Sequence, residues 1–279
     1  MPEVRIVRRV ASLQPSITVT LRDLELVRYL AACTKYCVEL CPELKNSPVA
    51  VIEDSWSAKT EQILSAKPDL VIASVPYRME SLAEIMKAGV PCLCLAPKTL
   101  ADVFLDVLHI ARIMGAEHRG LALVTRMERE IERVRRITSE LPRRRVYCEE
   151  WGKPLIHSQP WVAELVTAAG GEFVGEPGKQ VTEEEVAAAD PEVMIAAWCG
   201  AGDRVPLEKV IARRGWDETR AVREGRVFCV KDEFLNTPAS TLLLGLHALC
   251  AAIHPELFGE AAGLKRIFSA ENVQHARKA

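Results

Sequence analysis

Three cysteines near the start of the chain have a spacing that suggests chemistry. Cys33, Cys37 and Cys41 lie four residues apart. On a helix this spacing places three thiols on one face, and on a loop the thiols could converge on a soft metal or an iron–sulfur cluster. Because the spacing matches no standard zinc or ferredoxin pattern, buried or free thiols are favoured, and a three-cysteine site remains the alternative.

Two further cysteines occur where strands are expected to end. Cys148 lies in VYCEEWG and Cys199 in AAWCGAG, each after an apolar run and before a turn. The carboxyl ends of parallel strands meet at one edge of a sheet, so Cys37, Cys148 and Cys199 could converge on cobalt, iron, zinc or a cluster. Small residues packed under a loop are an equally good interpretation.

The few aromatic residues also fall in expected strand-to-helix loops. Tyr36, Trp56, Trp151 and Trp198 occupy such loops, and flat apolar side chains there suit a large planar ligand such as a corrin or haem. His157, in PLIHSQPW, could be an axial ligand or a polar contact. A loop histidine that is only hydrogen-bonded is the favoured alternative.

An alternation of strands and helices positions these residues. Runs typical of strands alternate with runs of helical spacing, which predicts parallel sheets covered by helices on both faces. The expected strands are residues 4–13, 48–52, 70–73, 90–95, 145–148, 193–197 and 227–230. The expected helices are residues 21–30, 60–66, 79–88, 161–169, 183–188, 210–213 and 240–253.

A long helical segment and an internal repeat divide the chain. Helical spacing runs from residue 100 to about 136, with one interruption at Gly115. TEQILSAKPDLVIA in the first half matches EEEVAAADPEVMIA in the second. We therefore predict an α/β protein of two Rossmann-like lobes, 1–99 and 143–279, joined by a rigid helical linker at 100–142. A ligand cleft is expected between the lobes.

The composition excludes several classes of protein. The formal net charge of the 279 residues is -2, which gives no basic surface for nucleic acid. The sequence contains no apolar run of the roughly 20 residues needed for membrane insertion. The first twenty residues do not read as a secretion signal, and nine cysteines without export favour a reducing cytosol. A periplasmic or membrane-anchored location is the alternative if a leader has been removed.

Several stretches resemble the cobalamin and iron-siderophore class of substrate-binding proteins. They are ASLQPSIT, TKYC, KPDLVIAS, EEWGKP, WVAELVTAAGG, WCG and the tail GRVFCVKDEFLNTPASTLLLGLHAL. The resemblance covers nearly the whole chain and is greatest to a cobalamin-binding branch. It implies two lobes bridged by a helix. In the cleft between them we expect Cys37 and Cys199 to supply soft ligands and Asn236 to make a polar contact to the bound molecule. In that class one surface glutamate per lobe docks onto a permease, which would assign Glu61 and Glu184, although solvated helix residues are the favoured interpretation without export.

The sequence departs from the class in places that bear on function. The glutamate expected after PSIT is absent, and an arginine expected near Ser240 is missing from FLNTPAST. The chain also has no G-x-G-x-x-G, P-loop, H-E-x-x-H or G-x-S-x-G signature, so an enzyme is not favoured.

Three functions follow from these observations. The first is a cytosolic carrier or sensor that binds a corrinoid, such as cobalamin, or another large metal-containing ligand. The second is an enzyme that uses an iron–sulfur cluster or another thiolate-bound metal on the cleft cysteines. The third is an exported ABC-transporter substrate-binding protein whose signal has been removed, with permease docking in that case only.

Overall fold

Two separate β-sheets organise the chain. The computed structural model describes residues 7–54 and 58–266. It divides into two units, which are Met1–Arg126 with Pro238–Ser240, and Met127–Thr237 with Thr241–Ala279. The predicted α/β class is confirmed, since each unit places helices around a largely parallel sheet.

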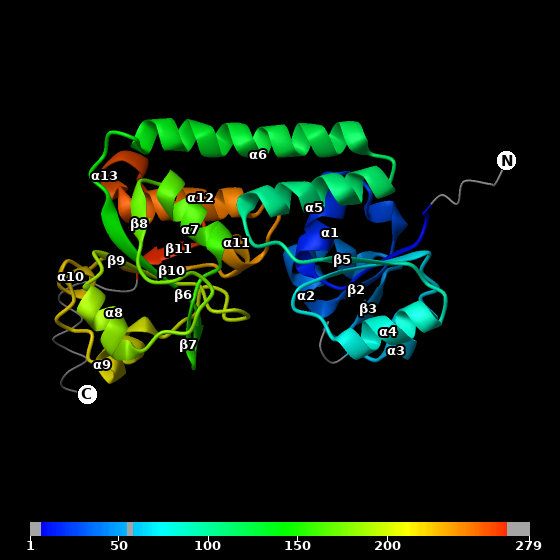
Figure 1. The fold of residues 1–279 in the computed structure, drawn as a ribbon, viewed down its shortest axis with the longest axis horizontal. Coiled ribbons are helices and arrows are strands. Elements are labelled where there is room, and N and C mark those ends of the chain that lie inside the picture. The colour runs from blue at the N-terminus through cyan, green and yellow to red at the C-terminus, as the bar shows by residue number, and fades with distance from the viewer. Residues whose placement is uncertain (1–6, 55–57, 267–279) are drawn as a thin grey trace. The chain divides into compact units, whose positions relative to one another are not determined.

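The first unit is built on a five-stranded parallel sheet of order β3-β2-β1-β4-β5. Its elements are β1 (Val10–Ser12), α1 (Pro15–Asp23), η1 (Val27–Tyr29), β2 (Leu30–Thr34), α2 (Lys35–Leu40), η2 (Pro42–Asn46), β3 (Ala50–Ile52), α3 (Thr60–Ser65), β4 (Leu70–Ser74), α4 (Met79–Lys87), β5 (Cys92–Leu95) and α5 (Leu100–Ile113). Figure 1 shows α3 and α4 on one face of this sheet and α1 and α5 on the other. Both faces are therefore covered, which explains the continuous apolar runs of the central strands.

The second unit contains a six-stranded sheet in which β11, β10, β9, β6 and β7 are neighbours and β8 also pairs with β6. Its elements are β6 (Arg144–Gly152), β7 (Leu155–His157), α7 (Pro160–Ala168), β8 (Gly171–Phe173), α8 (Glu183–Ala189), β9 (Val193–Ala196), α9 (Leu207–Arg214), α10 (Arg220–Arg223), β10 (Val227–Val230), α11 (Glu233–Asn236), α12 (Leu242–Ile253), α13 (Pro255–Phe258) and β11 (Leu264–Arg266). Helices α8 and α9 pack on one face, and α7 and α12 lie on the other (Figure 1).

The predicted helical linker consists of two helices. Helix α5 begins at a capping box in which Thr99 and Asp102 satisfy each other's backbone amides. Gly115, at φ 65°, lies between α5 and α6 (Glu117–Thr138), as the predicted interruption requires. The border between the two units falls within α6, so the boundaries of the predicted linker stay a prediction. None of the described helices is both long and apolar enough to cross a membrane.

The internal repeat has the same backbone in both units. In each copy a short helix, α3 or α8, leads through a proline turn into a buried strand, β4 or β9. The residue before the proline is left-handed in both copies, with φ 49° at Lys67 and φ 43° at Asp190. Because Pro68 and Pro191 disfavour the right-handed helical conformation in the preceding residue, neither helix continues into its proline, and α3 ends at Ser65 and α8 at Ala189.

Some expected elements differ from the observed ones. The helix expected over residues 21–30 begins earlier, since α1 starts at Pro15 and the later residues form η1 and the start of β2. Strand β6 is longer than expected and continues into an antiparallel hairpin with β7. Strand β11 is also antiparallel to its neighbour. The second sheet is therefore mixed rather than purely parallel.

Candidate functional site

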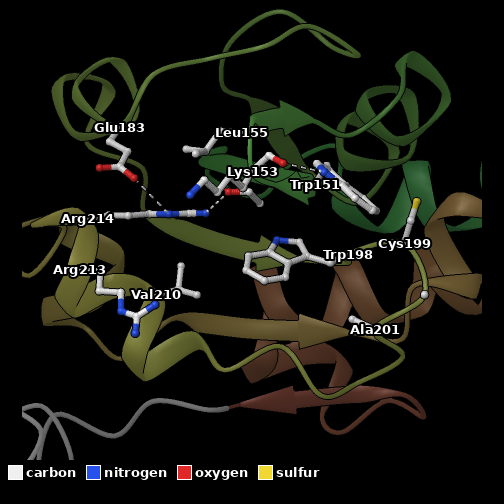
Figure 2. A pocket seen from close by; sticks show the side chains of 12 residues that line it. Trp151, Lys153, Leu155, Glu183, Trp198, Cys199, Ala201, Val210, Arg213 and Arg214 are labelled. Atoms are coloured by element: carbon white, nitrogen blue, oxygen red, sulfur yellow. Dashed lines mark hydrogen bonds and ion pairs between the residues drawn. The ribbon is translucent and has the colours of Figure 1, made fainter.

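A pocket of about 650 Å³ lies at the carboxyl ends of β6 and β9 in the second unit (Figure 2). Its walls come from the end of β6, the turn to β7, the start of α8, the loop after β9, and α9. The lining residues are Trp151, Gly152, Lys153, Leu155, Glu183, Trp198, Cys199, Gly200, Ala201, Val210, Arg213 and Arg214. The volume lies in the range of about 300–1,000 Å³ typical of small-molecule sites.

The order of the strands explains why the pocket forms here. Residues Arg144–Val146 of β6 pair with β8, and Val146–Glu149 pair with β9. The chain therefore winds outward in opposite directions from β6, which creates a crevice at the carboxyl ends of β6 and β9. The last part of β6 extends beyond this point, where the hairpin with β7 forms one wall of the crevice.

A buried carboxylate lies behind the pocket. Glu149 is 2% exposed and accepts hydrogen bonds from the Tyr147 hydroxyl at 2.6 Å and from Nε1 of Trp198 at 2.7 Å. Nη1 of Arg214 donates to both carboxylate oxygens, at 3.0 and 2.8 Å. Three donors thus satisfy the buried charge, as a buried carboxylate requires.

Arg214 connects this carboxylate to the pocket walls. Its Nη2 donates to the Gly152 carbonyl at 2.8 Å, and its Nε lies 3.6 Å from a carboxylate oxygen of Glu183. The guanidinium lies 4.8 Å from the ring centre of Trp216 and 5.8 Å from that of Trp198. Contacts on several sides therefore hold the last turn of α9 against the hairpin.

Two indoles and two large aliphatic side chains form most of the apolar part of the pocket. Trp198 lies at the centre of the lining in Figure 2, Val210 of α9 lies near it, and Trp151 and Leu155 come from the hairpin. Gly152 packs directly against Trp198, because an added Cβ would lie within 3.0 Å of three ring atoms. The indole of Trp198 is thus a fixed surface, whereas Trp151 is 45% exposed.

A group of polar side chains borders the pocket beside Cys199. Nδ2 of Asn236 donates to the Ala197 carbonyl at 2.7 Å and to the Cys199 sulfur at 3.2 Å. The thiol in turn donates to Glu150 at 3.6 Å, and Gln159 donates to the same carboxylate at 2.7 Å. Burial raises the pKa of both Cys199 and Glu150, so the thiol is protonated near neutral pH.

The structure gathers part of the predicted ligand-binding set in this one place. Trp151, Trp198 and Cys199 line the pocket, and Asn236 contacts it through Cys199. The prediction that Trp151 lies in a loop is wrong, because the residue lies within β6. The same prediction is confirmed for Trp198, which lies in the loop after β9.

Two predicted aromatic residues belong elsewhere. Tyr36 belongs to the first unit and lies in the first turn of α2 rather than in a loop. It is 36% exposed, and the Lys35 ammonium lies 5.1 Å from its ring centre. Trp56 lies outside the described residues. Contact of either residue with a ligand stays a prediction.

His157 does not occupy the loop expected for it. The residue ends β7 and is 2% exposed, with ring centres 5.3 Å from Tyr147 and 5.8 Å from Phe173. It is not part of the pocket lining. Burial lowers the pKa of this imidazole, so His157 is a neutral side chain of the interior.

The stability of the protein is expected to fall in acid because of His157. Its pKa in the folded state lies below the unfolded value of about 6.5, so the unfolded chain takes up the proton first. The contribution of His157 is full above pH ~6.5 and is lost as the pH falls through the folded pKa. Between pH 7.5 and pH 5.5, the midpoint temperature of thermal unfolding should therefore fall by less in the variant His157→Phe than in wild type. His118→Gln, at an exposed helix position, is the control, and an equal loss in His157→Phe and wild type would contradict this role.

The three cysteines of the first unit are all buried. Cys33 lies in β2, Cys37 in α2 and Cys41 at the end of α2, each 0% exposed. Burial raises the pKa of Cys37, but hydrogen bonds from Cys33 and from the hydroxyls of Thr18 and Thr34 outweigh it and lower the pKa below the usual value. Internal groups therefore surround the sulfur of Cys37, and its contact with a ligand or metal stays a prediction.

Cys148 is also placed differently from the expectation. It lies inside β6 rather than after it, is 0% exposed, and has a pKa raised by burial. Across residues 7–54 and 58–266, no group of three or more His, Cys, Asp or Glu side chains could hold a metal. Cys37 and Cys199 belong to different units, so a metal site shared by their two sulfurs stays a prediction.

Several residues of the site were not identified from the sequence. Glu149, Gly152, Lys153, Arg213 and Arg214 carry most of its polar and steric features. EEWGKP indicates only a family resemblance, and two arginines near the end of a helix are ordinary. The pairing of Glu149 with Arg214, 65 residues apart, has no signal in the sequence.

Known proteins share the fold and a stretch of sequence with this chain. A family model described as "Periplasmic binding protein" matches residues 10–234. The chain belongs to this family. It is also 24% identical over 217 residues to the uncharacterized ABC transporter substrate-binding lipoprotein YvrC of Bacillus subtilis (strain 168). The aligned segment covers 73% of this chain and 68% of the relative.

Several solved structures are similar to this chain. A periplasmic heme binding protein from Pseudomonas aeruginosa gives a TM-score of 0.81 at 20% identity, covering 93% of this chain and 97% of that one. The periplasmic vitamin B12 binding protein BtuF of Vibrio cholerae gives 0.71 at 22% identity, covering 88% and 96%. The heme-binding protein RhuT from Roseiflexus sp. RS-1 gives 0.77 at 24% identity, covering 89% and 98%. These likenesses confirm the two-lobed fold.

Proposed function

We propose that this protein is the ligand-binding component of an ABC transporter and that it binds a large, flat, metal-containing ring of the haem or corrinoid type. The observation that carries the proposal is the pocket walled by Trp151 and Trp198 at the carboxyl ends of β6 and β9. An indole face offers a broad apolar surface to a planar ring. Similar structures named as heme and vitamin B12 binding proteins support this class of ligand.

The position of Trp198 fits such a ligand. Its ring lies against the backbone of Gly152 on one side, and its Nε1 is bound to a buried carboxylate. The indole therefore loses little further conformational entropy when a ligand packs on it, and this preorganisation favours binding. The alternative of a cluster-dependent enzyme has no support from the described side chains, because no three or more His, Cys, Asp or Glu residues among them are grouped so that they could hold a metal ion.

The relatives favour export over the cytosolic role expected from the sequence. One is named a lipoprotein of an ABC transporter, and the similar structures are named periplasmic. We therefore propose that this protein works outside the cytoplasmic membrane and delivers its ligand to a permease. Six of the nine cysteines are buried, and a buried cysteine behaves as a small apolar side chain, so the cysteine content is a weak argument for the cytosol.

We further propose that Glu61 and Glu184 dock onto basic residues of that permease. Each is exposed and lies in the first turn of its helix, α3 or α8. The two helices are the matching elements of the internal repeat. The repeat thus presents one carboxylate per unit in an equivalent local setting.

Ligand titrations test the proposed function. Haemin and aquacobalamin are each added to the purified protein, and binding is followed by ligand absorbance and tryptophan fluorescence. One of the two should bind with a Kd below about 10 μM, and Trp198→Ala should weaken that binding at least tenfold, the effect of about 1.4 kcal/mol. Trp161→Phe is the matched control, since Trp161 is 6% exposed, lies outside the lining and bonds to the Leu235 carbonyl. Failure of both ligands to bind would contradict the proposal.

A further inference from the structure

Two cations in the pocket have no carboxylate partner among the described residues. Lys153 lies in the turn between β6 and β7, and Arg213 lies on α9. Both are exposed and both belong to the lining. Neither side chain takes part in an ion pair within residues 7–54 and 58–266, although salt bridges are common elsewhere in the second unit.

The third cation of the lining is fully engaged. Arg214 is paired with Glu149 through two hydrogen bonds and lies 3.6 Å from Glu183. Glu149 and Glu183 therefore pair with Arg214, whose side chain is only 7% exposed. Lys153 and Arg213, both exposed, are therefore left without a carboxylate partner among the described residues.

The placement of these cations relates them to the apolar wall. Figure 2 shows Arg213 and Val210 on one side of Trp198, and Lys153 and Leu155 above it. A planar ring that packs on Trp198 would thus bring its edge toward an ammonium and a guanidinium. A guanidinium recognises a carboxylate through two parallel N–H donors, and an ammonium recognises it as a point charge.

We propose that Lys153 and Arg213 form a subsite for carboxylate groups at the edge of the ligand. The inference rests on the proposed function and narrows it. The preferred ligand is a planar metal-containing ring with free carboxylate side groups, rather than one whose side groups are amides or esters. A neutral ring leaves both cations unpaired and gains only the apolar contact.

Matched pairs of ligands test this subsite. The first pair is haemin and haemin dimethyl ester, and the second is cobyrinic acid and cobinamide, which share a ring but differ in carboxylates. For the ring type that binds, wild type should prefer the carboxylate form at least tenfold. In the double variant Lys153→Gln/Arg213→Gln the preference should fall below threefold, while the affinity for the neutral form stays the same. Rising salt should weaken only the carboxylate form in wild type.

The control and the contrary outcomes separate this proposal from the previous one. Lys209→Gln removes one positive charge from an exposed position of α9 outside the lining and should keep the tenfold preference. Equal binding of both forms to wild type, or a preference that survives in the double variant, overturns the subsite and leaves the proposed function standing. If no form of either ring binds, the proposed function and the subsite both fail.

Discussion

Replacing Arg214 with methionine is expected to lower the free energy of unfolding by about 3–5 kcal/mol, the cost of removing one partner from a buried ion pair. The loss arises because the side chain of Glu149, 2% exposed, stays in the interior without its ion-pair partner and without both hydrogen bonds from Nη1. The bonds from Tyr147 and Trp198 remain but supply no positive charge. Urea unfolding at pH 7.5 measures the change.

Two further variants show whether the loss of stability comes from the Glu149 carboxylate that is left without its ion-pair partner. Arg213→Met removes the neighbouring charge at an exposed position and should change stability by no more than about 0.5 kcal/mol. The double variant Glu149→Gln/Arg214→Met removes both charges and should be more stable than the sum of the single effects predicts. A loss below about 1 kcal/mol in Arg214→Met, or strict additivity, would show that the pair does not stabilise the fold in this way.

The fold was predictable because its signals are local. Apolar strands separated by short helices define an α/β protein, and the repeat around Pro68 and Pro191 marks the same helix-to-strand turn twice. Both turns adopt the left-handed backbone that ends the helix, at Lys67 and Asp190. Each of these features depends on residues within one segment, so the sequence contains enough information to place them.

The site was less predictable because it depends on residues that meet only after folding. The carboxylate of Glu149 contacts Arg214 from a helix 65 residues away, and nothing in the surrounding sequence indicates that partner. The interior position of His157 depends on the hairpin of β6 and β7, and the residues of its turn, Lys153 and Pro154, are equally typical of a loop. Residue types at strand ends predict roles for Trp198, Cys199 and Cys148, and the structure places the first two in the pocket lining and buries Cys148 within β6.

Gly152→Ala is expected to destabilise the protein by about 1–3 kcal/mol, a typical cost of overpacking, and to weaken ligand binding. The added methyl group would overlap the ring of Trp198, which is held in place by its Nε1 bond to Glu149. The indole must move to relieve the overlap, and its movement breaks that bond and removes the flat wall of the pocket. Urea unfolding and titration with the ligand found to bind wild type measure the two effects.

The double variant Gly152→Ala/Trp198→Ala separates the overlap from other consequences of the methyl group. With the indole removed, the methyl group has space, so adding Gly152→Ala to Trp198→Ala should cost less than adding it to wild type. Binding should stay as weak as in Trp198→Ala alone, because the wall is absent in both. In the Trp198→Ala background the added methyl group thus costs less stability and no further binding, an outcome expected only if Gly152 acts through the Trp198 ring. If the methyl group costs the same in both backgrounds, the close packing of Gly152 on Trp198 does not explain why glycine occupies this position.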